Sequence, residues 1–213
     1  MNSNANMETF LQPTFFIDSD STEISDFVSE TVSKETNPKL MAIRIFYAVR
    51  DQIIYDPYAF TLKPERLKAS YILSQKSAFC IPKAIVLAAA ARAANIPARL
   101  GFANLINHLM GKELKQLLQT NLIAWHGYAE LYIDHQWIKV TPAFNADLCK
   151  HLNVPSVEFN AENHAIFPGK DNNGNQYMEY INYQGTFSDL PLDRIVKSMK
   201  HYYPQLKTYK ELI

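Results

Sequence analysis

Glycine and cysteine are both scarce in this sequence. Only 6 of its 213 residues are glycine. This excludes collagen-like and glycine-rich low-complexity chains and leaves no glycine-rich loop of the kind that cradles phosphate groups. The two cysteines, Cys80 and Cys149, cannot form the multi-bridge framework of a small secreted protein. A reducing compartment fits this composition, so we expect a cytoplasmic protein.

The sequence also lacks an excess of charge and a long apolar run. Its 21 Lys and Arg residues balance 21 Asp and Glu residues, so nothing favours binding to a nucleic-acid backbone, and we expect no nucleic-acid partner. The longest strictly apolar run, residues 84–91, is far shorter than the ~20 residues of a membrane-spanning helix. The N-terminus shows neither the basic nor the apolar region of a signal peptide. We therefore expect no membrane association.

The order of patterns along the chain predicts one domain of the α+β class. Residues 1–20 mix Asn, Ser and Thr with scattered aromatic residues and are expected to form an irregular N-terminal arm, followed by a single domain over residues 21–213. Apolar residues at helical spacing predict helices over residues 21–32, 38–56, 80–94 and 192–203. Beyond residue 97 a period of two predicts strands over residues 98–104, 125–133, 136–140 and 176–183. Helices followed by an antiparallel sheet give the α+β class.

The most distinctive predicted helix begins at Cys80 and is rich in alanine as far as Ala94. Pro82 belongs in its first turn, where the missing N–H costs nothing. Small side chains let a helix approach its neighbours closely, so we expect this helix to be central and buried. Lys83 and Arg92 are expected on its more exposed side.

Asp134 and His135 separate two predicted strands and indicate a tight hairpin. A two-residue loop places Glu130 directly opposite Lys139, and we expect an ion pair between these two side chains.

Cys80 is the candidate for chemistry because it lies at the predicted start of the buried helix. Unsatisfied N–H groups and the helix dipole favour an anion there, which would lower the pKa of the thiol and produce a reactive thiolate. A cysteine beside an alanine-rich helix can also be a small buried hydrophobic residue, and for an isolated cysteine that structural role is the commoner one.

A cysteine nucleophile needs a base, and six histidines could supply it. His126 lies in an alternating strand that can aim its imidazole, and His108, in a loop, is its main rival. Cys149 and His151 could be two metal ligands, but no matching pair exists elsewhere in the sequence. We therefore predict no metal site.

The segments around Cys80 and His126 resemble the core of the transglutaminase-like superfamily. In that family a cysteine heads a helix, a "GIPAR" segment leads into a strand, and a histidine opens the next strand. The resemblance implies a papain/transglutaminase-like fold, with the Cys-bearing buried helix packed on the antiparallel sheet that carries the His. It covers residues 77–145 and rests on Cys80-x2-Lys83-Ala84, Ile96-Pro97-Ala98-Arg99, His126-Gly127-Tyr128-x-Glu130 and Trp137-x3-Thr141-Pro142.

The resemblance also implies roles for individual residues. Cys80 matches the nucleophile of the family, and His126 matches its general base and acid. The family has an Asp in a W-x-x-x-D-P pattern where this sequence has Thr141. Threonine can orient an imidazole through one hydrogen bond but cannot supply a negative charge. Asn145, four residues further on, could orient the ring as in papain-like Cys-His-Asn sites, or it is a turn residue after the strand.

Four more residues are weaker candidates for contact with substrate or with an oxyanion. Gln75 could add a side-chain amide to the Cys80 backbone N–H, although a glutamine in a loop is usually solvated. Asn107 and His108 lie between two predicted strands, at the expected mouth of the site. Tyr128 flanks His126 and could contact substrate or pack within the sheet.

These roles imply a cysteine-dependent acyl-transfer enzyme that acts on amide bonds through a thioester. Hydrolysis, by a peptidase, amidase or deamidase, is expected rather than cross-linking. The expected substrate is a protein, a peptide or a small amide, with no cofactor, and no spaced acidic residues indicate a calcium loop. The alternative is a catalytically weakened or inactive transglutaminase-like binding module, because Thr141 stands in place of Asp. The sequence predicts no oligomeric state.

Overall fold

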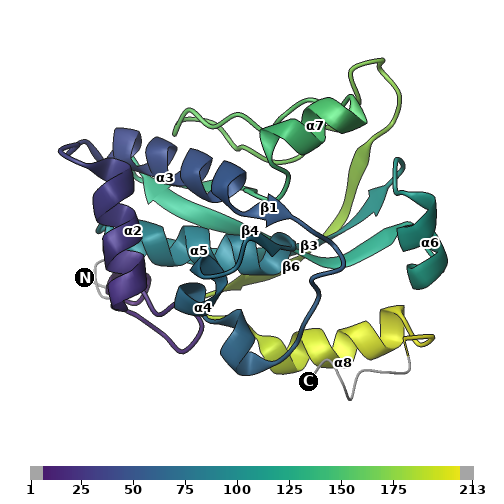
Figure 1. The fold of residues 1–213 in the computed structure, drawn as a ribbon, viewed down its shortest axis with the longest axis horizontal. Coiled ribbons are helices and arrows are strands. Elements are labelled where there is room, and N and C mark those ends of the chain that lie inside the picture. The colour runs from purple at the N-terminus through teal and green to yellow at the C-terminus, as the bar shows by residue number, and fades with distance from the viewer. Residues whose placement is uncertain (1–6, 207–213) are drawn as a thin grey trace.

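A four-stranded antiparallel sheet and one helix packed against it organise the molecule, shown in Figure 1 as a computed structural model that describes residues 7–206. The helix is α5 (Cys80–Ala93). The sheet has the strand order β5-β4-β3-β6 and consists of β3 (Ala98–Asn107), β4 (Leu122–Ile133), β5 (Gln136–Val140) and β6 (Met178–Phe187). The predicted α+β class is confirmed, as is the packing of the Cys-bearing helix on the sheet that carries His126.

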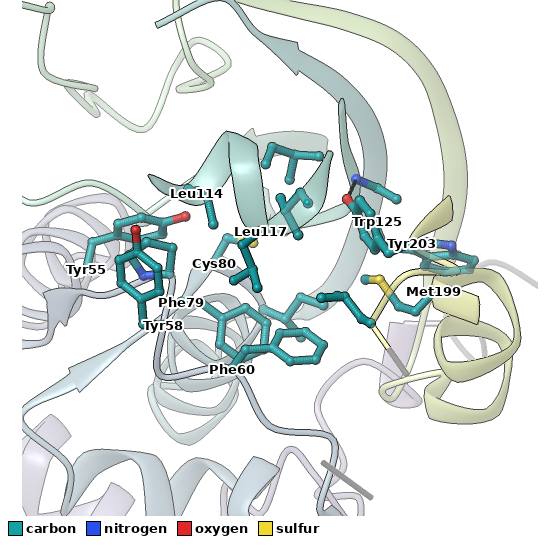
Figure 2. A pocket seen from close by; sticks show the side chains of 16 residues that line it. Tyr55, Tyr58, Phe60, Phe79, Cys80, Leu114, Leu117, Trp125, Met199 and Tyr203 are labelled. Atoms are coloured by element: carbon teal, nitrogen blue, oxygen red, sulfur yellow. Dashed lines mark hydrogen bonds between the residues drawn. The ribbon is translucent and has the colours of Figure 1, made fainter. Parts of the chain in front are cut away.

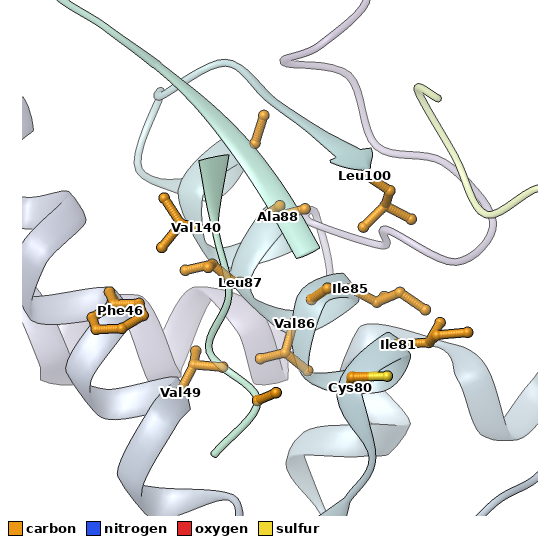
Figure 3. Close-up of a cluster of buried hydrophobic side chains, with 14 of the residues drawn as sticks. Phe46, Val49, Cys80, Ile81, Ile85, Val86, Leu87, Ala88, Leu100 and Val140 are labelled. Atoms are coloured by element: carbon orange, nitrogen blue, oxygen red, sulfur yellow. The ribbon is translucent and has the colours of Figure 1, made fainter. Parts of the chain in front are cut away.

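Helix α5 lies between this sheet and a layer of other helices (Figure 1). That layer consists of α2 (Thr22–Val32), α3 (Pro38–Gln52) and α4 (Ala69–Leu73). Every residue of α5 from Cys80 to Arg92 is buried, as expected for a helix that is covered all round. Figure 3 shows α5 side chains packed between Phe46 and Val49 of α3 and Leu100 and Val140 of the sheet. The core therefore fixes the position of the helix that begins with Cys80.

Short elements complete the fold around the start of α5. Strand β1 (Ile54–Tyr55) pairs in parallel with β2 (Ser77–Ala78), which directly precedes Phe79 and Cys80. The remaining elements are η1 (Pro64–Leu67), α6 (Lys112–Leu118), α7 (Ala146–Leu152) and α8 (Leu192–Tyr202). The sequence predicted α2, α3, α5 and α8 but missed α4, α6 and α7, which are short. Among residues 7–206, no helix has the length and apolar character needed to cross a membrane.

Part of the predicted N-terminal arm contributes to the core. Phe16 and Ile17 are buried, and the Ala98 N–H at the start of β3 donates a hydrogen bond to the Phe10 carbonyl. Residues 1–6 of the arm, like residues 207–213 at the other end, lie outside the described residues.

The predicted hairpin is confirmed, but the predicted ion pair within it is wrong. Asp134 and His135 have φ angles of 48° and 65°, which suits the right-handed twist of a two-residue hairpin. Glu130 does lie opposite Lys139. However, its carboxylate accepts a hydrogen bond from Nε of Arg99 at 2.7 Å and forms an ion pair with Nη2 of the same residue at 2.6 Å. Arg99 lies opposite Glu130 on its other side, in β3, and its fork of donors outcompetes a single ammonium group.

The expected exposure of Lys83 and Arg92 is also wrong, because α5 is buried on every side. Lys83 is fully buried, and its Nζ donates to the carbonyl oxygens of Arg50, at 2.8 Å, and Ile53. Lys83 thus satisfies carbonyl groups at the C-terminal end of α3. The Arg92 guanidinium donates to the carbonyl oxygen of Ala98 and to two further backbone carbonyls. Both side chains are buried because their N–H groups satisfy backbone acceptors.

Replacing Lys83 with methionine should destabilise the fold by about 2–4 kcal/mol, because two buried carbonyl groups lose their donor while the side chain keeps much of its volume. Urea unfolding followed by circular dichroism measures this difference. Lys150→Met, on an exposed position of α7, is the matched control and should change stability by less than ~0.5 kcal/mol. Equal stability of the two variants would contradict the capping role of Lys83.

Candidate active site

Cys80 is the first residue of α5 and lies where that helix meets the sheet. Its neighbours in α5 pack against β4 at Gly127, where an added Cβ would lie only 2.9 Å from Cα of Ile81. A distance this short leaves no room for a side chain. The glycine therefore lets the N-terminus of α5, and with it the Cys80 thiol, lie directly against β4.

His126 precedes this glycine in β4, and its imidazole is held by Thr141. His126 is only 2% exposed, and its Nε2 lies 3.1 Å from Oγ1 of Thr141. Thr141 directly follows the last residue of β5, so it faces β4 at the point where the pairing of the two strands ends. The ring of Phe167 lies 5.2 Å from the imidazole, centroid to centroid. The ring of Tyr180 lies 6.3 Å away, edge to face. One hydrogen bond and two aromatic contacts thus orient the imidazole.

The thiol of Cys80 lies against the edge of β4, next to the residue that follows His126. The ladder between β4 and β5 begins at Ala129, which leaves the edge at Gly127 without a strand partner on that side. The Gly127 N–H acts on the Cys80 thiol and favours its ionised form. The thiol therefore lies against the residue that follows His126. Among the described residues, no hydrogen bond joins Cys80 directly to His126.

Burial keeps both groups uncharged at neutral pH. It raises the pKa of the Cys80 thiol to about 11, and the N–H groups of Gly127, Ile81 and Cys80 itself only partly oppose this increase. Burial also lowers the pKa of His126 to about 3. The lowered thiol pKa expected from the helix start is thus wrong, because desolvation outweighs the N–H groups at the start of α5. The resting site holds a neutral thiol and a neutral imidazole.

Cys80 opens into a pocket of about 270 Å³, which Figure 2 shows and which we call the Cys80 pocket. It is lined by Tyr55, Pro57, Tyr58, Phe60, Phe79, Cys80, Ile81, Leu114, Leu117, Leu118, Ile123, Ala124, Trp125, Met199, Tyr203 and Leu206.

His126 opens into a second pocket of about 160 Å³, the His126 pocket. It is lined by Tyr55, Pro57, Leu105, Asn107, Leu109, Gly111, Leu114, Ile123, His126, Ala143, Phe144, Leu148, Leu152, Phe167 and Met178. Tyr55, Pro57, Leu114 and Ile123 line both pockets. The thiol and the imidazole therefore lie in two adjoining pockets, and these four residues form the wall between them.

A comparison with protein families identifies this arrangement. The model of the Transglutaminase-like superfamily matches residues 25–142, more than half of the chain. The chain belongs to the transglutaminase-like superfamily. The papain/transglutaminase-like fold expected from the resemblance is therefore confirmed.

Comparisons with individual proteins support the same fold but identify no activity. No curated protein matches the chain. A candidate cysteine protease from Cytophaga hutchinsonii has a similar structure, with a TM-score of 0.52 and 16% sequence identity over 87% of this chain. The chain spans only 55% of that protein. A candidate protease from Parabacteroides distasonis is 14% identical over 59% of this chain and 25% of its own length, with a TM-score of 0.40.

At the position of the superfamily aspartate, Thr141 contacts the histidine, but Asn145 has a different role. Oδ1 of Asn145 accepts a hydrogen bond from the backbone N–H of Tyr55 at 3.2 Å. No hydrogen bond between Asn145 and His126 occurs among the described residues. The structure therefore gives Asn145 the role of anchoring β1, which carries Tyr55 into the wall between the two pockets.

The structure does not bring Gln75 or His108 to the thiol. Gln75 is exposed, its Nε2 donates to Oγ of Ser74 at 2.8 Å, and it lines a separate pocket without Cys80. Nε2 of His108 lies 3.0 Å from Oε2 of Glu179 at the surface. A side-chain amide from Gln75 therefore does not complete an oxyanion site in this arrangement.

The other two weak candidates lie nearer to the site. Asn107 lines the His126 pocket, although its Oδ1 already accepts the N–H of Leu109. Tyr128 is 2% exposed, and its ring covers Gly101 so closely that an added Cβ would lie 2.3 Å away. This contact favours the role of Tyr128 in sheet packing.

Sequence reasoning missed two parts of the pocket walls, Tyr55 and helix α6. Leu114, Leu117 and Leu118 of α6 line the Cys80 pocket. Their spacing of three and four residues is an apolar helical pattern that could have been found in the sequence. Tyr55 belongs to a two-residue strand, for which no local pattern exists.

Replacing Gly127 with alanine should destabilise the protein by about 1–3 kcal/mol, because the new Cβ meets the rigid backbone of Ile81. Thermal and urea unfolding measure the loss. Gly111→Ala is the matched control, since a Cβ there meets nothing within 4 Å, and it should change stability by less than ~0.5 kcal/mol. An unchanged stability of Gly127→Ala would contradict the close approach of α5 to β4.

Proposed function

We propose that the protein is a cysteine-dependent acyl-transfer enzyme that hydrolyses amide bonds in a protein, a peptide or a small amide. One observation carries this proposal. The Cys80 thiol lies against Gly127, directly beside His126, and the two side chains open into adjoining pockets. A cysteine nucleophile and a histidine base that rigid elements hold in adjoining pockets can cleave an acyl bond in two steps.

In the first step the Cys80 sulfur attacks the acyl carbon, and His126 takes the thiol proton. Since both groups are neutral at rest, proton transfer accompanies the attack instead of preceding it. The hydrogen bond to Thr141 engages Nε2, so Nδ1 is the nitrogen left to act as base, with the Nε2 proton donated to Thr141 Oγ1. His126 then gives the proton to the leaving nitrogen, the C–N bond breaks, and a thioester remains on Cys80.

In the second step water attacks the thioester. His126 accepts a proton from that water, the C–S bond breaks, and the sulfur regains its proton as the acid leaves. The backbone N–H of Cys80, at the start of α5, is suited to stabilise the oxyanion in both steps.

Water is the proposed acyl acceptor because of the chemistry of the His126 pocket. None of the described residues that line it is an Asp or Glu, so no carboxylate there would attract the ammonium group of a lysine. Its volume of about 160 Å³ is ample for water. These features favour hydrolysis over cross-linking.

The test is the hydrolysis of p-nitrophenyl acetate, whose small acyl group makes no demand on the Cys80 pocket. All variants carry Cys149→Ser, which removes the other free thiol. Replacing Cys80 with alanine should lower the rate of p-nitrophenol release at least ~10²-fold, because the nucleophile is lost. A rate that is unchanged in Cys80→Ala would refute the proposed nucleophile.

The second candidate is a binding module with a transglutaminase-like fold and no turnover. The neutral thiol–imidazole pair and the absence of a carboxylate at Thr141 favour it. Thr141→Asp discriminates between the two functions, because a carboxylate at Nε2 raises the pKa of His126 and stabilises the imidazolium. If the protein is the proposed enzyme, Cys80 of the wild type, which has Thr141, becomes acylated by the ester. Acylation that appears only in Thr141→Asp would identify the wild type as the binding module.

A further inference from the structure

We propose that the Cys80 pocket binds a large apolar side chain on the acyl part of the substrate, aromatic or branched aliphatic. This inference deepens the proposed function and rests on it, since it names the substrate class for the same nucleophile.

The first observation is the absence of charge around the thiol. None of the described residues that line the Cys80 pocket is Asp, Glu, Lys, Arg or His. The aromatic rings of Phe60 and Phe79 pack together on one side, 5.1 Å between centroids, and leucines of α6 line another (Figure 2). Such a surface favours an apolar group, whereas a carboxylate or an ammonium would lose its hydration without gaining a side chain of opposite charge.

A neighbouring pocket shows the opposite chemistry. It adjoins the Cys80 pocket at Tyr58 and Phe60, and it is lined by Arg66, Lys76 and Gln75 as well as by apolar residues. That pocket could receive an acidic or polar group, but it does not contain Cys80. The segment around Tyr58 thus separates a charged pocket from the apolar one that holds the nucleophile.

The Cys80 pocket is large enough for an aromatic or branched aliphatic side chain. Its volume of about 270 Å³ lies just below the ~300–1,000 Å³ of pockets that bind whole drug-sized ligands. One aromatic or branched aliphatic side chain next to the acyl carbon fits this scale. The rest of the substrate would extend past the shared wall at Tyr55 and Leu114.

One side chain of helix α6, Leu117, can be used to test whether an apolar group binds in the Cys80 pocket. Leu117 lines the Cys80 pocket and is 48% exposed, so an apolar ligand can cover it and gain buried area. Because Leu117 is not among the described residues packed against the hydrophobic core, a substitution at this position leaves the core intact. Leu40 in α3 is 46% exposed and, among the described pocket linings, belongs to neither of these pockets, which makes it the matched control.

The experiment measures alkylation of Cys80 by chloromethyl ketones of acetyl-phenylalanine, acetyl-alanine and acetyl-glutamate, in the Cys149→Ser background. In each reaction the Cys80 sulfur displaces chloride and forms a thioether, and the thiol proton passes to His126 and then to solvent. Rates are divided by those of the same reagents with free cysteine. Iodoacetamide, which carries no side chain, reports whether Cys80 reacts at all.

The phenylalanine reagent should react at least about tenfold faster than the alanine reagent, since it buries additional apolar surface. The glutamate reagent should react no faster than the alanine reagent. Leu117→Glu should reduce the phenylalanine/alanine ratio at least about threefold, while Leu40→Glu should preserve both the ratio and the iodoacetamide rate.

Two results would overturn the inference. A phenylalanine/alanine ratio no higher than that with free cysteine, or a preference for glutamate, would refute the apolar pocket while His126-dependent alkylation by iodoacetamide still supports the proposed nucleophile. A failure of every reagent to modify Cys80 would overturn both this inference and the proposed function.

Discussion

Replacing His126 with alanine is expected to slow the acylation of Cys80 by about 10²–10⁴-fold near neutral pH, the usual contribution of a general base. The effect is large because burial raises the pKa of the Cys80 thiol to about 11. Almost no thiolate then exists at pH 7, and the imidazole must remove the proton as the sulfur attacks. Stopped-flow release of p-nitrophenol measures the acylation rate.

The pH dependence separates this role from a structural one. The deficit of His126→Ala should shrink as the pH rises toward 11, because the thiolate then forms without a base. His108→Ala, at a surface position paired with Glu179, is the control and should keep the wild-type rate. Thr141→Val, which removes only the hydrogen bond to Nε2, should cost about tenfold, less than loss of the base itself. A deficit of His126→Ala that is constant at all pH values would contradict the role of the imidazole as base.

The free energy of unfolding should decrease by about 3 kcal/mol between pH 6.5 and pH 4 because of His126 alone. Burial lowers the pKa of this imidazole in the folded protein to about 3, whereas in the unfolded chain it is about 6.5. Above pH 6.5 neither state binds the proton, and the contribution is absent. Below pH 6.5 the unfolded state binds a proton that the folded state excludes, so acid shifts the equilibrium toward unfolding.

Urea unfolding of wild type and His126→Gln at a series of pH values measures this contribution. The variant lacks the buried imidazole, so its stability should decrease less steeply between pH 6.5 and 4, and the difference in slope should accumulate to about 3 kcal/mol. Gly111→Ala, which changes no titratable group and whose new Cβ meets nothing within 4 Å, should keep the wild-type slope. Equal slopes for wild type and His126→Gln would show that the imidazole is solvated and not buried.

The sequence was most informative where a regular pattern extends over many residues. The alanine-rich run after Cys80 predicted the buried helix α5, and the period of two predicted β5 over its exact span. The motifs around Cys80 and His126 predicted the family, which the match over residues 25–142 confirms. Thr141 was one of two candidates, with Asn145, for orienting the imidazole, and the structure brings Oγ1 of Thr141 to Nε2 of His126.

The sequence was least informative where contacts between distant segments decide the outcome. Nothing near Lys83 indicates that the end of α3, some thirty residues earlier, provides its two carbonyl acceptors. Likewise, the helix start at Cys80 suggests a low thiol pKa, and only the packing against β4 shows that desolvation dominates. The hydrogen bond from Tyr55 to Asn145 spans ninety residues, beyond any local signal.

The most direct test of the central claim, that Cys80 is the acyl-accepting nucleophile, is to trap the acyl-enzyme. The Cys149→Ser protein is mixed with p-nitrophenyl acetate, quenched in acid during the first turnover, and examined by intact-mass and peptide mass spectrometry. We predict one acetyl group per chain, located on the peptide that contains Cys80, removed by hydroxylamine and absent from Cys80→Ala. Acetyl groups found only on lysines, or equally in Cys80→Ala, would contradict the assignment of Cys80 as nucleophile.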